Sequence, residues 1–188
     1  EKLLEYIAKF VDKKLKKFFG VFWETSLTRN EFNYPKIADE IMDKFIGSIR
    51  SKLQNTVLVF MSVHGTQIGE FAETYQGYLE NRLPLLSFVF PKWFQDDYKM
   101  AMKNLKRNSR RLTTHFDLHE TLLDIMDLTS LGNDYIKLRK KEVGEKRHTG
   151  MSLFLPVPEG RTCNDAGISP HWCTCNPVKK MTSKHHIV

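Results

Sequence analysis

Residues 56–69, TVLVFMSVHGTQIG, give the strongest indication of the fold in this chain. The first half of this stretch is continuous apolar sequence rather than an alternation of apolar and polar residues, which predicts a strand buried on both faces. A second run of this kind, LLSFVF, covers residues 85–90 between Pro84 and Pro91. Strands buried on both faces are typical of parallel sheets that are covered by helices. The two runs therefore predict central strands of a mostly parallel sheet.

The segments around these two runs predict helices and one more strand. The aromatic run at residues 18–23 is rich in residues that favour strands. Four segments are expected to be helical, namely 3–19, 35–53, 96–108 and 117–128. Helices that alternate with short apolar strands predict an α/β layer structure, with helices flanking the sheet.

The regular pattern fades from about Gly132 onward. The remaining stretch contains four prolines and all three cysteines of the chain. Proline-rich sequence without apolar periodicity is typical of irregular structure. We therefore expect an α/β core over residues 1–131 and an irregular, cysteine-bearing extension over residues 132–188.

Composition narrows the class of protein. The chain has 188 residues, of which 41% are hydrophobic, so it can bury a core and is not a disordered tail. No apolar run approaches the roughly 18 residues that a bilayer span needs, which predicts no transmembrane segment. The net charge of +7 favours acidic partners. The basic runs lack interleaved aromatic residues, so no specific nucleic-acid site is predicted. Because the chain begins at Glu1, we expect it to be part of a longer or processed product.

Two loops follow predicted strands and are the first places to look for a site. In open parallel sheets, reactive groups gather beyond the carboxyl ends of the strands. Residues 25–30 follow the aromatic run, and residues 63–69 follow the apolar run that ends at Met61. The second loop contains His64 followed by glycine. A lone histidine in such a place is more often a packed or capping residue than a ligand.

Residues 58–69 resemble the strand and Ser-Asp-His-Gly turn of the alkaline-phosphatase and sulfatase superfamily. More narrowly, they resemble an animal family abundant in nematodes, catalogued as domain of unknown function 229. The resemblance continues in order through 77–86, 104–108, 111–117, 121–125, 152–154, 161–168 and 171–175. It covers most of the chain from Phe18 to Cys175. It implies the C-terminal part of an alkaline-phosphatase-like α/β sandwich, whose nucleophile lies in an upstream half.

The resemblance also implies a chemistry in which one or two divalent metals, such as zinc, calcium or manganese, hold a phosphate or sulfate ester. The aspartate of the family's Asp-His-Gly turn is Val63 here, and valine has no lone pair to donate. The histidine of the family's first loop is replaced by Arg29, which can contact an anion but cannot ligate a metal. His64 remains a candidate ligand. His148 is a weaker candidate, with an exposed loop histidine as its alternative.

Two functional hypotheses follow from this resemblance. In the first, the chain is a catalytically inactive secreted relative that binds a sulfated or phosphorylated ligand, with Arg29 as an anion contact. In the second, it is the C-terminal half of an active hydrolase whose nucleophile lies upstream. A catalytic zinc needs at least three protein ligands, and His64 with His148 does not reach that number. Val63 and Arg29 therefore favour the first hypothesis, with no metal bound by the chain and no catalytic residue assigned in it.

The three cysteines admit two readings. From the residues alone, Cys173-Thr174-Cys175 beside His171 could hold zinc, although the usual Cys-x-x-Cys spacing is absent. The family resemblance implies a secreted or lumenal protein, in which thiols are oxidised. A bond between Cys173 and Cys175 would be strained. The expected bridge therefore joins Cys163 to either of them, in a tail that docks on the body with Trp172 partly buried.

Asp117 stands near the start of a predicted helix, between His115 and His119. Short acidic side chains are favoured at helix starts because they accept hydrogen bonds from main-chain amides there. We interpret Asp117 as a cap or turn residue.

Overall fold

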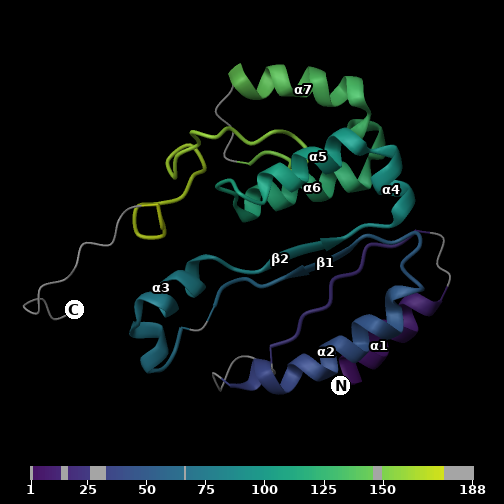
Figure 1. Ribbon diagram of the computed structural model, residues 1–188, viewed down its shortest axis with the longest axis vertical. Helices are drawn as coiled ribbons and strands as arrows, with labels where there is room; N and C mark the ends of the chain where they lie inside the picture. The colour runs from purple at the N-terminus through teal and green to yellow at the C-terminus, as the bar shows by residue number, and fades with distance from the viewer. Residues whose placement is uncertain (1, 14–16, 26–32, 66, 146–149, 176–188) are drawn as a thin grey trace, which may run out of the picture. The chain divides into compact units, whose positions relative to one another are not determined.

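The computed structural model describes residues 2–13, 17–25, 33–65, 67–145 and 150–175 (Figure 1). The chain divides into two compact units, Glu1–Phe94 and Gln95–Val188. Each unit has buried apolar side chains of its own. None of the helices in the described ranges combines the length and the apolar character that a membrane crossing requires.

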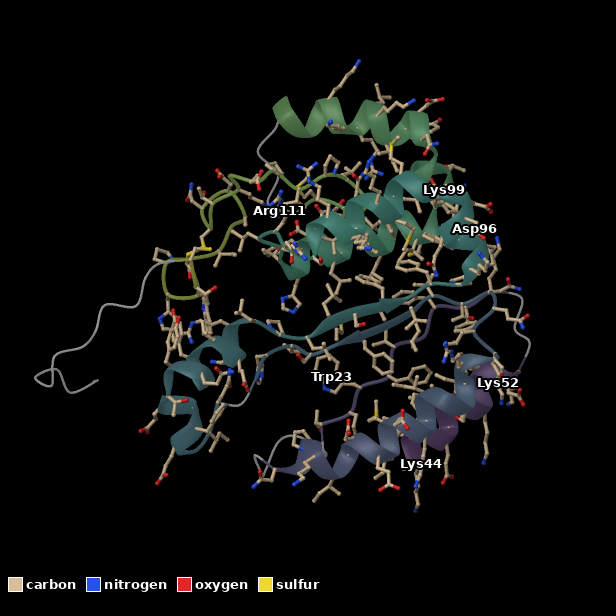
Figure 2. All side chains as sticks on the ribbon, viewed as in Figure 1. Trp23, Lys44, Lys52, Asp96, Lys99 and Arg111 are labelled. Atoms are coloured by element: carbon tan, nitrogen blue, oxygen red, sulfur yellow. A yellow bond between two sulfur atoms is a disulfide. The ribbon has the colours of Figure 1, made fainter. Side chains whose placement is uncertain are left out.

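The first unit contains a pair of amphipathic helices, α1 (Lys2–Asp12) and α2 (Tyr34–Arg50). Helix α2 lies where the apolar periodicity predicts it, whereas α1 begins as predicted but ends at Asp12, before the predicted end at residue 19. Pro35 stands in the first turn of α2, where its missing amide costs nothing. Their core is a cluster of apolar side chains from the C-terminal half of α2 and the chain beyond it, joined by one face of α1. On the exposed face of α2, Lys44 pairs with Glu40 at 2.6 Å (Figure 2).

The predicted strand at residues 18–23 is wrong, because this stretch forms no helix or strand. Two of its aromatic side chains, Phe18 and Phe22, instead pack against α1. Phe18 and Phe22 both meet the ring of Phe10 edge-on, with centroids 5.1 and 5.5 Å away. Trp23 remains 66% exposed (Figure 2). The residues that favour a strand here are thus placed beside a helix by ring contacts, without strand pairing.

Strands β1 (Leu58–Met61) and β2 (Leu86–Val89) form a two-stranded sheet. The strands lie where the apolar runs predict them, but they pair antiparallel, with Leu58 opposite Val89. The predicted mostly parallel sheet is therefore not what these two strands form. Their connection contains the short helix η1 (Glu70–Glu73) and α3 (Tyr75–Arg82) and returns beside the end of β1 without crossing the sheet. Continuous apolar sequence indicated burial on both faces, whereas β2 alternates between half-buried and exposed residues.

The helices α4 (Lys92–Asp97), α5 (Lys99–Asn108), α6 (His115–Met126) and α7 (Asn133–Glu145) follow, with the 3₁₀ turn η2 (Leu128–Leu131) after α6. The predicted helix over 96–108 is broken at Tyr98, whose backbone is not helical. Helix α7 corrects the expectation of irregular structure from Gly132 onward. It is mostly polar, so its periodicity is weak, yet it packs against α5 and η2 and buries Ile136.

The centre of the second unit is residues 151–157, a buried segment without helix or strand. Its main chain is held by side chains of α5. Asn108 donates from Nδ2 to the carbonyls of Leu153 and Leu155 at 2.8 and 2.6 Å, and its Oδ1 accepts from the amide of Val157 at 3.0 Å. Buried main-chain groups need hydrogen-bond partners. In this segment one asparagine side chain supplies the partners that a neighbouring strand would supply in a sheet.

Helices α5 and α6 supply further partners to the same segment. Asn104 donates to the carbonyl of Phe154 at 2.8 Å, and the hydroxyl oxygen of Thr121 accepts from the amide of Leu153 at 2.8 Å. The buried Thr121 hydroxyl itself donates to the carbonyl of Asp117 at 2.6 Å. The irregular segment is thus fixed by side chains at defined positions on two helices.

Candidate functional site

Strand β1 continues into the turn that carries the family resemblance. The amide of Ser62 donates to the carbonyl of Leu85 at 2.9 Å, and the hydroxyl oxygen of Ser62 accepts from the amide of Leu85 at 2.8 Å. These two bonds extend the pairing of β1 and β2 by one position. Ser62 therefore helps to hold the start of the turn against β2.

Gly65 explains why the turn keeps its shape. A Cβ atom at this position would lie 2.4 Å from the carbonyl oxygen of Glu80, in α3. Such a distance is shorter than any van der Waals contact, so only glycine fits. Helix α3 is in turn fixed at its start, where the hydroxyl oxygen of Thr74 accepts from the amide of Gly77 at 3.0 Å. The turn is therefore packed against a capped helix.

His64 stands on the exposed side of this turn. Its Nδ1 lies 2.7 Å from the carbonyl oxygen of Gly65. A carbonyl can only accept, so Nδ1 carries the proton of this bond, and a neutral ring then offers its lone pair at Nε2. The neighbouring Val63 is 46% exposed. The turn thus presents an imidazole and an aliphatic side chain where the resemblance to the alkaline-phosphatase and sulfatase superfamily implies two ligands.

The described residues do not fit a cage for a divalent metal at this turn. A catalytic zinc needs three protein ligands, and calcium needs more oxygen atoms still. Among the described residues, His64 belongs to no group of three side chains whose ligand atoms lie close enough together to share an ion. Arg29 and His148, the other two residues predicted from the resemblance, lie outside the described residues. The group that does satisfy this criterion is Cys163, Cys173 and Cys175.

An ion pair in the second unit was missed by sequence reasoning. Asp117 is fully buried and Arg161 is 4% exposed, and they pair in two parallel bonds, Nη1 to Oδ2 at 2.8 Å and Nη2 to Oδ1 at 3.1 Å. Arg161 also donates to the carbonyl of Leu112 at 3.2 Å. The charged groups are thus hydrogen-bonded on several sides, as burial requires. Arg161 stands in a segment that carries the family resemblance, but nothing in the sequence pairs it with Asp117.

Asp117 is at the same time part of the cap predicted for α6. The capping residue itself is Thr114, and Asp117 closes a capping box by accepting from the Thr114 amide at 2.7 Å. Its other oxygen accepts from the amide of Met151 at 2.8 Å. One carboxylate therefore joins the start of α6, the buried segment and the start of the cysteine-bearing tail.

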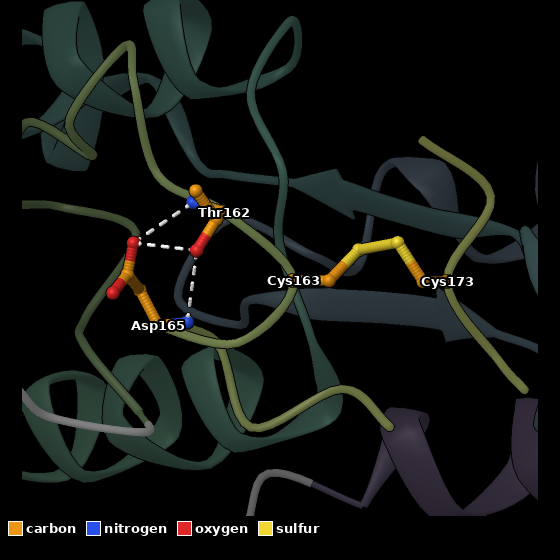
Figure 3. Close-up of a disulfide and its surroundings, with 4 residues drawn as sticks. All are labelled: Thr162, Cys163, Asp165 and Cys173. Atoms are coloured by element: carbon orange, nitrogen blue, oxygen red, sulfur yellow. Dashed lines mark hydrogen bonds between the residues drawn. A yellow bond between two sulfur atoms is a disulfide. The ribbon is translucent and has the colours of Figure 1, made fainter. Parts of the chain in front are cut away.

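The tail contains the disulfide that the sequence predicts (Figure 3). The bond joins Cys163 to Cys173, with Cα atoms 6.0 Å apart, while Cys175 is a free and exposed thiol. The turn that bears Cys163 is closed by Thr162 and Asp165. The amide and hydroxyl of Thr162 donate to Asp165 Oδ2 at 3.0 and 2.7 Å, and the amide of Asp165 donates back to Thr162 Oγ1 at 3.2 Å.

The remaining prediction for the tail concerns its docking. Trp172 is 48% exposed, so its ring is half-buried. Arg111 adds a second ionic contact through its Nη1, which lies 2.9 Å from Glu159 Oε1, near the start of the tail. Together with the pair of Arg161 and Asp117, this contact attaches the beginning of the tail to α6 and to the turn that precedes it.

Comparison with known proteins identifies the family and no individual relative. Neither the curated proteins nor the solved structures include a match to this chain. A family model does match, over residues 1–188, and it confirms the family that the sequence resembles. The chain therefore belongs to the family described as protein of unknown function (DUF229).

Proposed function

We propose that this chain is a catalytically inactive, secreted relative of metal-dependent phosphate and sulfate ester hydrolases, and that it binds an anionic ligand at the turn after β1. The observation that carries the proposal is Val63, which stands on the exposed turn beside His64. The resemblance to the alkaline-phosphatase and sulfatase superfamily implies a metal-binding aspartate at this position.

The turn supports the proposal because its backbone packing is well defined, whereas it offers fewer metal ligands than the resemblance implies. Gly65 packs against the carbonyl of Glu80, and Ser62 extends the pairing of β1 with β2. Valine contributes no lone pair, and a single imidazole is too few ligands to replace the water molecules around a divalent ion. An anion makes smaller demands on the site, since it needs hydrogen-bond donors and positive charge. Arg29 and a net charge of +7 supply positive charge to the chain.

The disulfide supports the secreted part of the proposal. Bridges such as Cys163–Cys173 persist in oxidising compartments and are rare in the reducing cytosol. The retained His64-Gly65 turn favours the second candidate, in which the chain is the C-terminal half of an active hydrolase. The two candidates differ in what the turn binds, a bare anion in the first and a metal-bound ester in the second.

Metal analysis and a sulfate titration test the proposal together. We expect the purified chain to carry no stoichiometric zinc, manganese or calcium and to leave nitrophenyl phosphate and nitrophenyl sulfate unhydrolysed. Calorimetric titration with inorganic sulfate should show binding that Arg29→Ala weakens, whereas Arg110→Ala, which removes an exposed arginine elsewhere, leaves it unchanged. One equivalent of metal that disappears in His64→Ala would contradict the proposal and support the hydrolase. Sulfate binding that both variants reduce equally would contradict the anion site.

A further inference from the structure

Cys175 places a free thiol beside a disulfide. The sulfur atoms of Cys163, Cys173 and Cys175 all lie within 4.8 Å of one another. Two of them form the bridge, and the third is exposed and unoxidised. Disulfides exchange when a thiolate attacks one of the bridge sulfurs, so a thiol at this distance is a built-in nucleophile. We propose that the three cysteines form a thiol–disulfide exchange unit, in which Cys175 displaces Cys173 from Cys163 and the bridge migrates along the tail.

The geometry selects which sulfur is attacked. Attack on the sulfur of Cys173 would join two residues separated only by Thr174, and a ring that small is strained. Attack on the sulfur of Cys163 produces the bridge Cys163–Cys175, which closes a loop of a similar size to the original one. Cys163 is thus the shared partner, and the two cysteines of the Cys-x-Cys pair compete for it.

The exchange balances without an external oxidant or reductant. Cys175 releases its proton to water, and the electron pair of its thiolate attacks the sulfur of Cys163. The Cys163–Cys175 bond forms while the Cys163–Cys173 bond breaks, and Cys173 leaves as a thiolate that takes up a proton. The chain contains one disulfide and one thiol before and after the step.

The surroundings hold Cys163 and let the bridge move. The turn around Cys163 is fixed by the bonds between Thr162 and Asp165. The carbonyl of Cys163 also accepts from the amide of Ile168 at 2.8 Å. The present bridge spans a sequence separation of 10, and the alternative spans 175 − 163 = 12. In the chain-entropy model, the probabilities of closing the two loops in the unfolded chain differ by a factor of about 1.3. Loop size therefore favours neither disulfide isomer strongly.

The exchange would change what the tail presents to solvent. In the structure the free thiol is the exposed Cys175, while Cys173 is 7% exposed. After exchange the free thiol is at position 173. Because reaction of a thiol with an outside reagent requires access, the second isomer is protected from alkylation and from mixed disulfides if position 173 stays buried. The position of the bridge would therefore decide whether the free thiol is exposed to solvent or buried.

Localised alkylation of the native chain tests the proposal. Protein kept acidic, to hold thiols protonated, is shifted to mildly alkaline pH without added thiol, quenched with acid after a series of times and labelled with N-ethylmaleimide in denaturant. After reduction and a second alkylating label, fragmentation across Thr174 assigns the maleimide to Cys173 or to Cys175. We expect label to move from Cys175 to Cys173, at a rate independent of protein concentration. Label confined to Cys175 at all times, or a rate that rises with protein concentration, would overturn the proposal.

Three single variants check the pairing without relying on the kinetics. Cys173→Ser should form the bridge Cys163–Cys175 and show no free thiol in denaturant. Cys175→Ser should keep the original bridge and take up no label, which also shows that the tail still folds. Cys163→Ser should leave Cys173 and Cys175 both free, because they cannot bond readily to each other. Two free thiols in Cys173→Ser would contradict the proposal even if the other variants behave as expected.

Discussion

Arg161 and Asp117 form a buried, two-bond ion pair across 44 residues of sequence, and their four contacting atoms are separated by 2.8 and 3.1 Å. The pair lies at the start of the cysteine-bearing tail, inside the second unit. Breaking one partner of such a pair leaves the other charge buried and uncompensated. The stability of the second unit should depend on this contact more than on any ion pair at its surface.

Asp117→Asn should lower the free energy of unfolding of the second unit by about 3 to 5 kcal/mol, because Arg161 loses its counter-ion and the cap of α6 is weakened. Urea unfolding followed by circular dichroism measures the change. Asp134→Asn is the matched control, since Asp134 pairs with Lys137 at 97% exposure and should change stability by less than about 0.5 kcal/mol. Equal effects of the two substitutions would contradict the assigned role of the buried pair.

Asn108→Ala should destabilise the second unit by about 2 to 4 kcal/mol, because three buried main-chain groups of residues 151–157 lose their partner. Hydrogen exchange should show faster exchange at the amide of Val157 than in the unaltered chain. Ser109→Ala, at the exposed neighbouring position, is the control and should leave that amide protected. Unchanged protection at Val157 in Asn108→Ala would show that the segment is held by other contacts.

Gly65→Ala should destabilise the first unit by about 1 to 3 kcal/mol, because the new methyl group collides with the carbonyl of Glu80. Gly47→Ala provides a control of opposite sign. Nothing lies within 4 Å of a Cβ at position 47 of α2, so alanine should stabilise that helix by roughly 0.5 to 1 kcal/mol. Thermal unfolding measures both changes. A loss of stability in both variants would mean that the collision with the Glu80 carbonyl is not the cause of the effect at position 65.

Val63→Asp should increase the affinity of the turn for zinc, because it returns a carboxylate ligand beside His64. We expect a gain of about tenfold or more, which corresponds to about 1.4 kcal/mol, measured by calorimetry. Val63→Asn, which adds a neutral amide of the same size, should gain less. Arg29→His should add to the effect if that loop faces the same ion. Zinc binding that stays the same in every variant would show that this turn does not correspond to the family's metal site.

Cys163→Ser should lower the free energy of unfolding of the second unit by about 2 to 3 kcal/mol, because a bridge over ten residues restricts the unfolded chain. Hydrogen exchange in β1 and β2 should stay unchanged, since both strands belong to the first unit. Protection lost in the strands as well would mean that the tail supports more of the protein than the unit it belongs to.

Local patterns predicted the elements of this chain better than their pairing. Helices α1 and α2 follow the apolar periodicity, and β1 and β2 coincide with the two apolar runs. The direction of strand pairing depends on the path of residues 62–85, which apolar runs do not encode. Helix α7 was missed because its sequence is mostly polar and its contacts with α5 and η2 stabilise it.

The candidate site shows the same division. The residues alone left the cysteine chemistry open between zinc and a disulfide, and the family resemblance favoured a bridge from Cys163 to one of two partners. The choice of Cys173 depends on how the tail folds, and so does the proximity of Cys175. Asp117 could be interpreted as a cap because capping is local. Its bond to Arg161 could not be foreseen, because nothing along the sequence marks two residues 44 positions apart as neighbours.

The reliance of residues 151–157 on side chains bears on the order in which the second unit folds. A strand at a sheet edge can add its hydrogen bonds one after another, whereas this segment meets donors and acceptors that are already held on α5 and α6. Those side chains remain hydrated until the segment arrives, and then lose their water together. Since the contacts join residues 32 to 50 positions apart, the entropy cost of closing these loops comes before the hydrogen bonds that offset it. On the ribosome, completion of this unit therefore waits until residues 151–157 have emerged, and a shorter nascent chain contains α5 and α6 without the buried segment that their side chains bind.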